Sequence, residues 1–168
     1  ENRIIIREVI KFTSHPTADL SVGILRTVGN HTNKLFSLTK EFPKIGEKIR
    51  TWSFPGPKEI EKNEKESEFK FPFRDAKGII TNHFPKGRDR HMLPFNCFEA
   101  EMEIKGGSSG GPVASMTGSV FGVNSTGIDG LNISYITSIH ALFDLKLPNM
   151  LLPDETEGRE VSIQEIID

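Results

Sequence analysis

The chain of 168 residues lacks the features that mark several classes of protein. It has a single cysteine, which excludes an internal disulfide framework. No apolar run approaches the length needed to cross a bilayer, so we expect no transmembrane segment and no membrane partner. The formal net charge is only -2, which argues against a nucleic-acid partner bound through bulk charge.

Metal-binding patterns are also missing. The five histidines are scattered, and none has a second histidine or a cysteine at ligand spacing. We therefore expect no metal and no cofactor. The single cysteine, Cys97, lies between Phe95 and Phe98, which favours a buried, inert thiol. Twelve phenylalanines against one tyrosine and one tryptophan predict a core built on phenylalanine.

What the chain does have is an unusual glycine-rich stretch, residues 106–113, with the sequence GGSSGGPV. Four glycines and a proline are incompatible with a helix interior or a regular strand. The stretch presents Ser109 on a tight turn, where consecutive N–H groups can converge on an oxyanion. A flexible linker is the alternative, but an apolar alternating run follows at once, which favours a loop between strands.

Residues 107–112 resemble the Gly-x-Ser-Gly-Gly-Pro loop of the chymotrypsin-like (trypsin-fold) serine peptidases. The resemblance implies that Ser109 is the nucleophile and that the N–H groups of Gly107 and Ser109 form the oxyanion hole. Ser108 stands where animal digestive members carry an aspartate, so activation by a new N-terminus is not expected. Together with the lack of disulfides, this points to the disulfide-free, bacterial-type branch.

A second match involves Asp19, at the mouth of a strand predicted over residues 18–25 that follows a first strand over 3–12. An aspartate there is commonly a turn or cap residue. The stretch 15–25 is, however, similar to the family segment that carries the triad aspartate, and aspartate precedes serine as in the family. The resemblance implies that Asp19 fixes the histidine tautomer and stabilises the imidazolium.

The triad histidine has no good candidate. The resemblance puts it several tens of residues before the aspartate, upstream of Glu1. His15 lies only four residues before Asp19 and on the wrong side to reach the serine. The chain begins without a methionine or a signal-like segment, so we expect a processed or truncated product. A missing segment or another chain would then supply the histidine, or the protein is a degenerate relative.

The strand predicted over residues 119–127 ends in small residues and resembles the substrate-binding strand of the family. The resemblance implies that Ser125 lies near Asp19 and that Thr126 and Gly127 pair with the substrate backbone. An ordinary strand with a terminal glycine is the alternative. By counting six residues back from the serine, Glu103 would shape the P1 pocket and favour basic side chains.

The predicted fold class is all-β. The resemblance implies two six-stranded antiparallel Greek-key barrels, the first incomplete in this chain, and a short C-terminal helix. We expect the remainder of the first barrel at 1–38, the connection at 39–45, the second barrel and closing helix at 46–147, and a tail at 148–168. The charge-dense stretch 58–70 is predicted as a surface loop rather than a short helix.

The sequence thus predicts a serine endopeptidase acting on a protein or peptide substrate through an acyl-enzyme. A non-catalytic trypsin-fold module that binds extended peptides along residues 125–127 is one alternative. An unrelated all-β domain whose glycine-rich loop binds an anion is another. The lack of disulfides and of a signal segment favours the cytoplasm. Residues 124–126 form a glycosylation acceptor whose glycan would block the cleft, which disfavours a glycosylating secretory route.

Overall fold

The structure, a computed structural model, describes residues 7–26, 36–56, 58–63, 66–128, 130–152 and 154–167. It divides into two compact units. Unit 1 comprises Glu1–Leu35 and His140–Asp168, and unit 2 comprises Phe36–Ile139. Each unit is described by itself.

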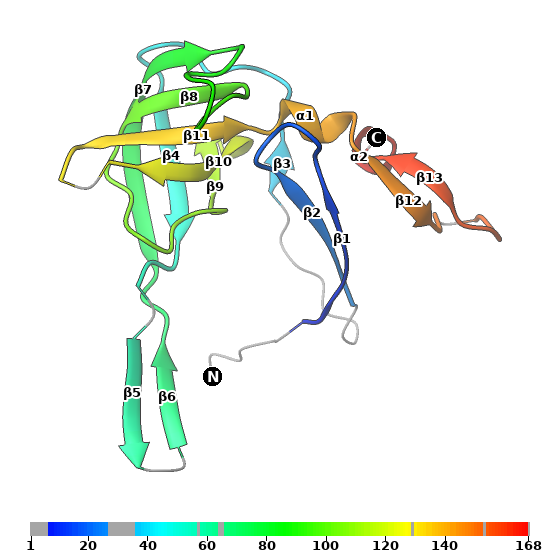
Figure 1. Cartoon of the computed structure of the whole chain (residues 1–168), viewed down its shortest axis with the longest axis horizontal. Coiled ribbons are helices and arrows are strands. Elements are labelled where there is room, and N and C mark those ends of the chain that lie inside the picture. Colours follow the sequence, from blue (N-terminus) through cyan, green and yellow to red (C-terminus); the bar gives the residue numbers. More distant parts are fainter. Residues whose placement is uncertain are drawn as a thin grey trace. The chain divides into compact units, whose positions relative to one another are not determined.

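Unit 2 is a closed barrel of six antiparallel strands (Figure 1). These strands are β4 (Lys48–Ser53), β7 (Arg74–Phe84), β8 (Cys97–Glu101), β9 (Pro112–Ser115), β10 (Ser119–Gly127) and β11 (Ile133–Ser138). Around the barrel they run β4-β7-β8-β11-β10-β9, and β9 pairs with β4 to close it. Because β11 lies between β8 and β10, the order is a Greek key. The short strand β3 (Ser37–Leu38) adds to β10 in parallel.

Alternation along the strands decides what faces the barrel core. In β4, Ile49, Thr51 and Ser53 are buried while the residues between them are not, as expected for a strand with one buried face. The largest core cluster contains the following apolar residues: Ile49, Ile80, Phe98, Ala100, Met102, Val113, Phe121 and Ile136. Phe98 and Phe121 meet edge to face, with ring centroids 5.6 Å apart. Cys97 is fully buried, as predicted.

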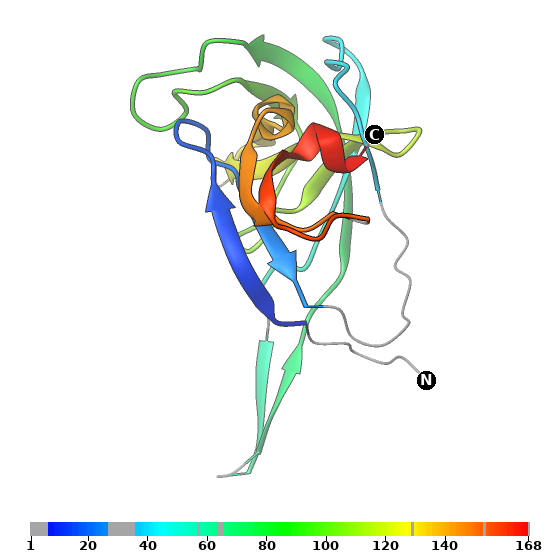
Figure 2. The same ribbon diagram turned by 90° about the vertical axis from the view of Figure 1, so that its right-hand side faces the viewer.

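A hairpin of β5 (Lys58–Asn63) and β6 (Glu66–Lys70) interrupts the barrel between β4 and β7 and extends away from it (Figures 1 and 2). The prediction of a loop over residues 58–70 was wrong. Ser53 pairs with Arg74, and Lys58 pairs with Lys70 a few residues further on, so the hairpin prolongs an antiparallel pair that the barrel already holds. The pairing comes from this tertiary context and not from the β-propensity of the charged sequence.

Among its described residues, unit 1 contains two hairpins and two short helices (Figure 2). The elements are β1 (Val9–Ser14), β2 (Ser21–Leu25), α1 (His140–Phe143), β12 (Lys146–Met150), β13 (Arg159–Ser162) and α2 (Ile163–Ile167). Its core joins Leu145, Leu147 and Ile163, and Val22 of β2 packs against them. The Lys11 ammonium donates to the Pro148 carbonyl, so the beginning of the chain and its tail belong to one unit.

The structure shows one closed six-stranded barrel and a short helix, α1, near the C-terminal end. Within the described residues the segment 7–26 forms only the β1–β2 hairpin. A second barrel and the domain boundaries at residues 38, 45 and 147 stay predictions. The first residues of the strand predicted over 3–12, residues 3–6, lie outside the described residues. No helix in the described part of the chain is long and apolar enough to cross a membrane.

Candidate active site

The loop of residues 106–111, here called the Gly/Ser loop, lies between the end of β8 and the start of β9. Two of its glycines, Gly107 and Gly111, show why other residues do not fit. Gly107 has a φ of 88°, in the left-handed region that other residues avoid. A Cβ added at Gly111 would lie 2.7 Å from the Trp52 carbonyl oxygen, which is closer than contact allows. The loop therefore turns sharply against β4 and leaves Ser109 exposed.

The Ser109 side chain faces strand β10 and a small pocket. Its Oγ donates to the carbonyl oxygen of Ser125 at 3.0 Å. The pocket holds about 200 Å³ and is lined by Ile104, Lys105, Gly106, Ser109, Ser125, Thr126 and Gly127. Strand β9 pairs with β10 only as far as Val123, so beyond Asn124 the strand borders this pocket. Ser109 and three of the predicted substrate-binding residues, Ser125, Thr126 and Gly127, thus line one pocket.

The backbone N–H groups of the Gly/Ser loop fall into two groups. Those of Ser108, Gly110 and Gly111 donate to carbonyl oxygens of the chain at 3.0, 2.8 and 3.0 Å. Those of Gly106, Gly107 and Ser109 have no acceptor within the described part of the chain. Two of these donors, those of Gly107 and Ser109, lie on either side of Ser108 and are the pair that the predicted oxyanion hole requires.

Beneath the loop lie four buried polar side chains, which we call the polar platform: Thr51, Ser53, Ser108 and Asn124. The hydroxyls of Ser53 and Ser108 are 3.1 Å apart, and the Asn124 amide donates to the Thr51 hydroxyl at 2.7 Å. Sequence reasoning missed this platform. It treated Asn124 as a glycosylation acceptor, but the side chain is 1% exposed and hydrogen-bonded, so the folded chain offers no acceptor there.

Glu103 lies at the surface beside this site and outside the lining of the pocket. Its carboxylate forms an ion pair with Arg74 at 2.7 Å. The hydrogen bond from Arg74 holds the pKa of Glu103 below its usual value. The negative charge of Glu103 is therefore already matched by a cation of the chain.

Asp19 belongs to unit 1, where it is exposed in the turn before β2, and its pairing with the Ser109 site stays a prediction. His15 caps the same turn, since its Nδ1 accepts the N–H groups of Thr17 and Ala18. In unit 2, His83 stacks on Phe98 and its Nε2 bonds to the Asn96 side chain at 3.0 Å. His83 pairs with the start of β8, whereas the Gly/Ser loop follows its end.

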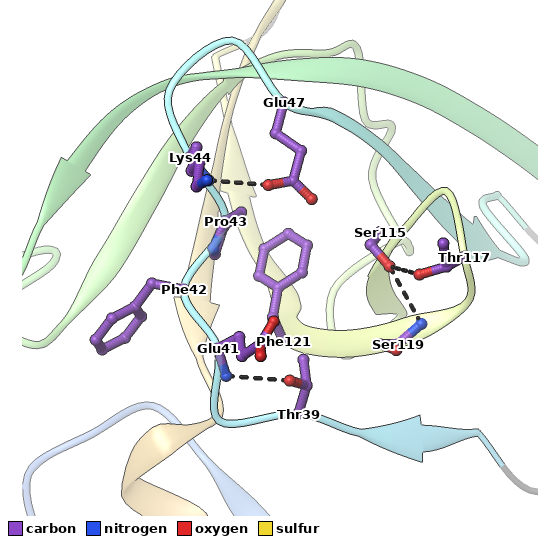
Figure 3. Close-up of a pocket in the computed structure, with 10 residues that line it drawn as sticks. All are labelled: Thr39, Glu41, Phe42, Pro43, Lys44, Glu47, Ser115, Thr117, Ser119 and Phe121. Atoms are coloured by element: carbon purple, nitrogen blue, oxygen red, sulfur yellow. Dashed lines mark hydrogen bonds between the residues drawn. The ribbon is translucent and has the colours of Figure 1, made fainter.

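A larger pocket, about 320 Å³, opens at the far end of β9 (Figure 3). Its hydroxyl groups bond to one another: Ser115 Oγ and Thr117 Oγ1 are 2.7 Å apart. The turn that borders it is closed by the Lys44 N–H, which donates to the Glu47 carboxylate at 2.9 Å. The groups named here therefore have partners within the hairpin and the turn.

No protein-family model matches the chain, and no curated protein matches it. Among solved structures, Rv3671c from M. tuberculosis H37Rv, a serine-to-alanine mutant in its inactive form, matches with a TM-score of 0.55 and 17% identity over 79% of this chain. A second structure of the Rv3671c protease, also an inactive form, matches with a TM-score of 0.54 and 17% identity over the same share. The fold is chymotrypsin-like. This confirms the likeness predicted from the Gly/Ser loop at the level of fold. The chain spans 58% and 60% of the length of those two solved chains.

Proposed function

We propose that the chain belongs to a serine endopeptidase that cleaves peptide bonds through an acyl-enzyme on Ser109. One observation carries this proposal: the exposed Ser109 lies beside a pocket, and its own N–H and that of Gly107 have no acceptor within the described residues. In the reaction Ser109 Oγ attacks the scissile carbonyl carbon. The two N–H groups then stabilise the negative charge on its oxygen.

The reaction needs a base that takes the Ser109 proton and returns it to the leaving amine. In the structure that proton is donated to the Ser125 carbonyl, and the rings of His15 and His83 bond elsewhere. We propose that a histidine from outside this chain, in a preceding segment or another chain, supplies the base. Asp19 would orient it by accepting its N–H. The chymotrypsin-like fold and the order of Asp19 before Ser109 support this assignment.

The substrate would bind as an extended strand along Ser125, Thr126 and Gly127. Main-chain hydrogen bonds along a strand edge give affinity, and an adjacent pocket gives specificity for one side chain. The pocket is lined by an apolar side chain, Ile104, and a cation, Lys105. Instead of the basic P1 preference predicted from Glu103, we propose a P1 side chain that is not basic.

The test is the intact mass of the full-length protein after reaction with a fluorophosphonate probe, which modifies only an activated serine. We expect one adduct in the wild type and none in Ser109→Ala. Digestion and mass mapping should locate the adduct on the peptide that contains Ser109. Absence of an adduct from the wild type would refute the proposal, as would an adduct that persists in Ser109→Ala.

One observation favours a second candidate, a non-catalytic module that binds extended peptides. The Ser109 hydroxyl is bonded to the main chain at Ser125, inside the proposed binding strand, and is not held by a base. This candidate predicts no fluorophosphonate adduct. It also predicts that peptide binding is weakened when Gly127 is replaced by a bulky residue, because a Cβ there already lies 2.9 Å from Ile104.

A further inference from the structure

The direction of each oxyanion donor is fixed by the carbonyl group of the same peptide plane. A trans peptide is planar, and its C=O and N–H point in opposite directions. A hydrogen bond to the carbonyl oxygen of Ser108 therefore also orients the N–H of Ser109. A bond to the carbonyl oxygen of Gly106 does the same for Gly107, and there the Gly56 N–H donates at 3.2 Å.

The Ser108 carbonyl oxygen accepts two hydrogen bonds from opposite parts of the chain. The N–H of Gly111 donates at 3.0 Å from within the Gly/Ser loop, and the Asn124 amide nitrogen donates at 3.3 Å from strand β10. Only the bond from Asn124 anchors the plane to the barrel. The Asn124 main chain adds two more links, since its carbonyl accepts the Gly110 N–H and its N–H donates to Gly111.

Asn124 is held in turn by Thr51 of β4. The same amide nitrogen donates to the Thr51 hydroxyl at 2.7 Å, and that hydroxyl donates to the Pro112 carbonyl at 2.8 Å. The Oδ1 of Asn124 is buried and has no partner within the described part of the chain. Burying an amide oxygen without a partner is unfavourable, so the presence of an asparagine at this position needs an explanation. The hydrogen bonds that its amide nitrogen donates to Thr51 and to the Ser108 carbonyl provide that explanation.

We propose that Asn124, anchored by Thr51, is a positioning residue that aims the Ser109 N–H at the oxyanion. This inference rests on the proposed peptidase function. The two side chains that hold the Ser108 peptide plane to the barrel, Asn124 and Thr51, are neutral and buried. The Ser53 and Ser108 hydroxyls, 3.1 Å apart and buried, belong to the same platform and hold the residue before the nucleophile.

The experiment uses the full-length protein and separates the reaction step of a fluorophosphonate probe from its binding. The inactivation rate constant and the probe's binding constant are measured for Asn124→Ala, Thr51→Val and Thr51→Ser. Thr137→Val is the matched control, because Thr137 is an equally buried threonine of the barrel whose hydroxyl has no partner within the described residues. All measurements are made well below the unfolding temperature of the least stable variant.

We expect the inactivation rate constant of Asn124→Ala and Thr51→Val to fall roughly 10- to 100-fold, somewhat less than for removal of an oxyanion donor. The probe's binding constant should stay within about twofold, since ground-state contacts are unchanged. Thr51→Ser keeps the hydroxyl and should retain most of the wild-type rate, and Thr137→Val should match the wild type. Equal rate constants for Thr51→Val and Thr137→Val would overturn the proposal, and so would a Thr51→Ser variant as slow as Thr51→Val.

A second readout does not depend on activity. The amide resonance of Ser109 in a ¹⁵N-labelled protein should shift in Asn124→Ala and Thr51→Val and stay in place in Thr137→Val. If the wild type forms no adduct, the proposed function fails while this measurement still decides the positioning role. A Ser109 resonance that is the same in all four proteins would overturn it.

Discussion

Strand β9 is held by hydroxyl groups at both of its ends, but the hydroxyl at its start is buried and the turn at its end is exposed. At its start the buried Thr51 hydroxyl donates to Pro112 at 2.8 Å, beneath the Gly/Ser loop. At its end Ser115 bonds to the exposed Thr117 and accepts the Ser119 N–H at 3.3 Å, beside the pocket of Figure 3. Water can replace the second set of bonds and not the first. The barrel therefore fixes the geometry of β9 at its start, beside the Gly/Ser loop.

The largest effect should come from adding a methyl group to the backbone at each end. Gly107 and Gly118 both have positive φ, 88° and 96°, so alanine strains the backbone by about 1–2 kcal/mol at either site. Only at Gly107 does the new Cβ also meet backbone, the Gly56 nitrogen at 3.1 Å. We expect fluorophosphonate labelling to slow by ~100-fold in Gly107→Ala, as on loss of an oxyanion donor. Labelling of Gly118→Ala should stay near the wild-type rate, and equal losses would show that the two ends do not differ.

The second prediction compares the two hydroxyls by their contribution to stability. Thr51→Val leaves the Asn124 amide and the Pro112 carbonyl short of a partner, so the free energy of unfolding should fall by about 1–3 kcal/mol. Thr117→Val removes an exposed bond and should change it by less than about 0.5 kcal/mol. Urea unfolding of both variants measures the difference. Similar decreases in the two variants would mean that burial does not separate the two ends.

Lowering the pH should destabilise the protein at a site other than the polar platform, because the platform contains only hydroxyls and an amide, which do not titrate. The N–H groups of Met92 and His91 lower the pKa of Asp89 to about 2, and its ordinary value is about 3.9. A lowered folded-state pKa gives stability that is complete above about pH 4 and is lost as the pH falls toward 2. Urea midpoints of the wild type should decline in this window, and those of Asp89→Asn should decline less. Parallel curves would contradict the role of Asp89.

The smallest effect should come from Glu103, which lies near the loop end and outside the pocket lining. Because Arg74 already pairs with its carboxylate, Glu103→Ala should leave the relative rates for basic and uncharged P1 substrates within about twofold. Lys105→Ala, which removes the lining cation, is the companion variant. A loss of basic P1 cleavage in Glu103→Ala alone would restore the prediction made from the sequence.

The local parts of this architecture could be predicted from the sequence because they depend on local chemistry. The strand predicted over residues 119–127 is β10, and the glycines of residues 106–111 identified a sharp loop between strands. The β5–β6 hairpin was missed because charged residues carry little β-propensity, and its pairing is inherited from β4 and β7.

The role of Asn124 could not be predicted for a different reason. In sequence it is part of a polar stretch at the end of a strand, and Thr51 is an ordinary strand residue. Their contact exists only because closure of the barrel brings β4, β9 and β10 around one loop. Asp19 shows the converse, because its local pattern resembles a known family segment while its place in a triad stays a prediction.

The contacts that shape the Gly/Ser loop also bear on the order of folding. The bonds from Thr51, Ser53 and Asn124 join residues that are 61, 55 and 73 positions apart in the chain. Contacts of such separation form late, because the entropy of closing long loops is lost before they contribute. We therefore expect a chain still being synthesised, or one partly unfolded, to have no working oxyanion hole. The proposed proteolytic capacity would be among the last properties that the folding chain acquires, and it would be lost as soon as the barrel opens.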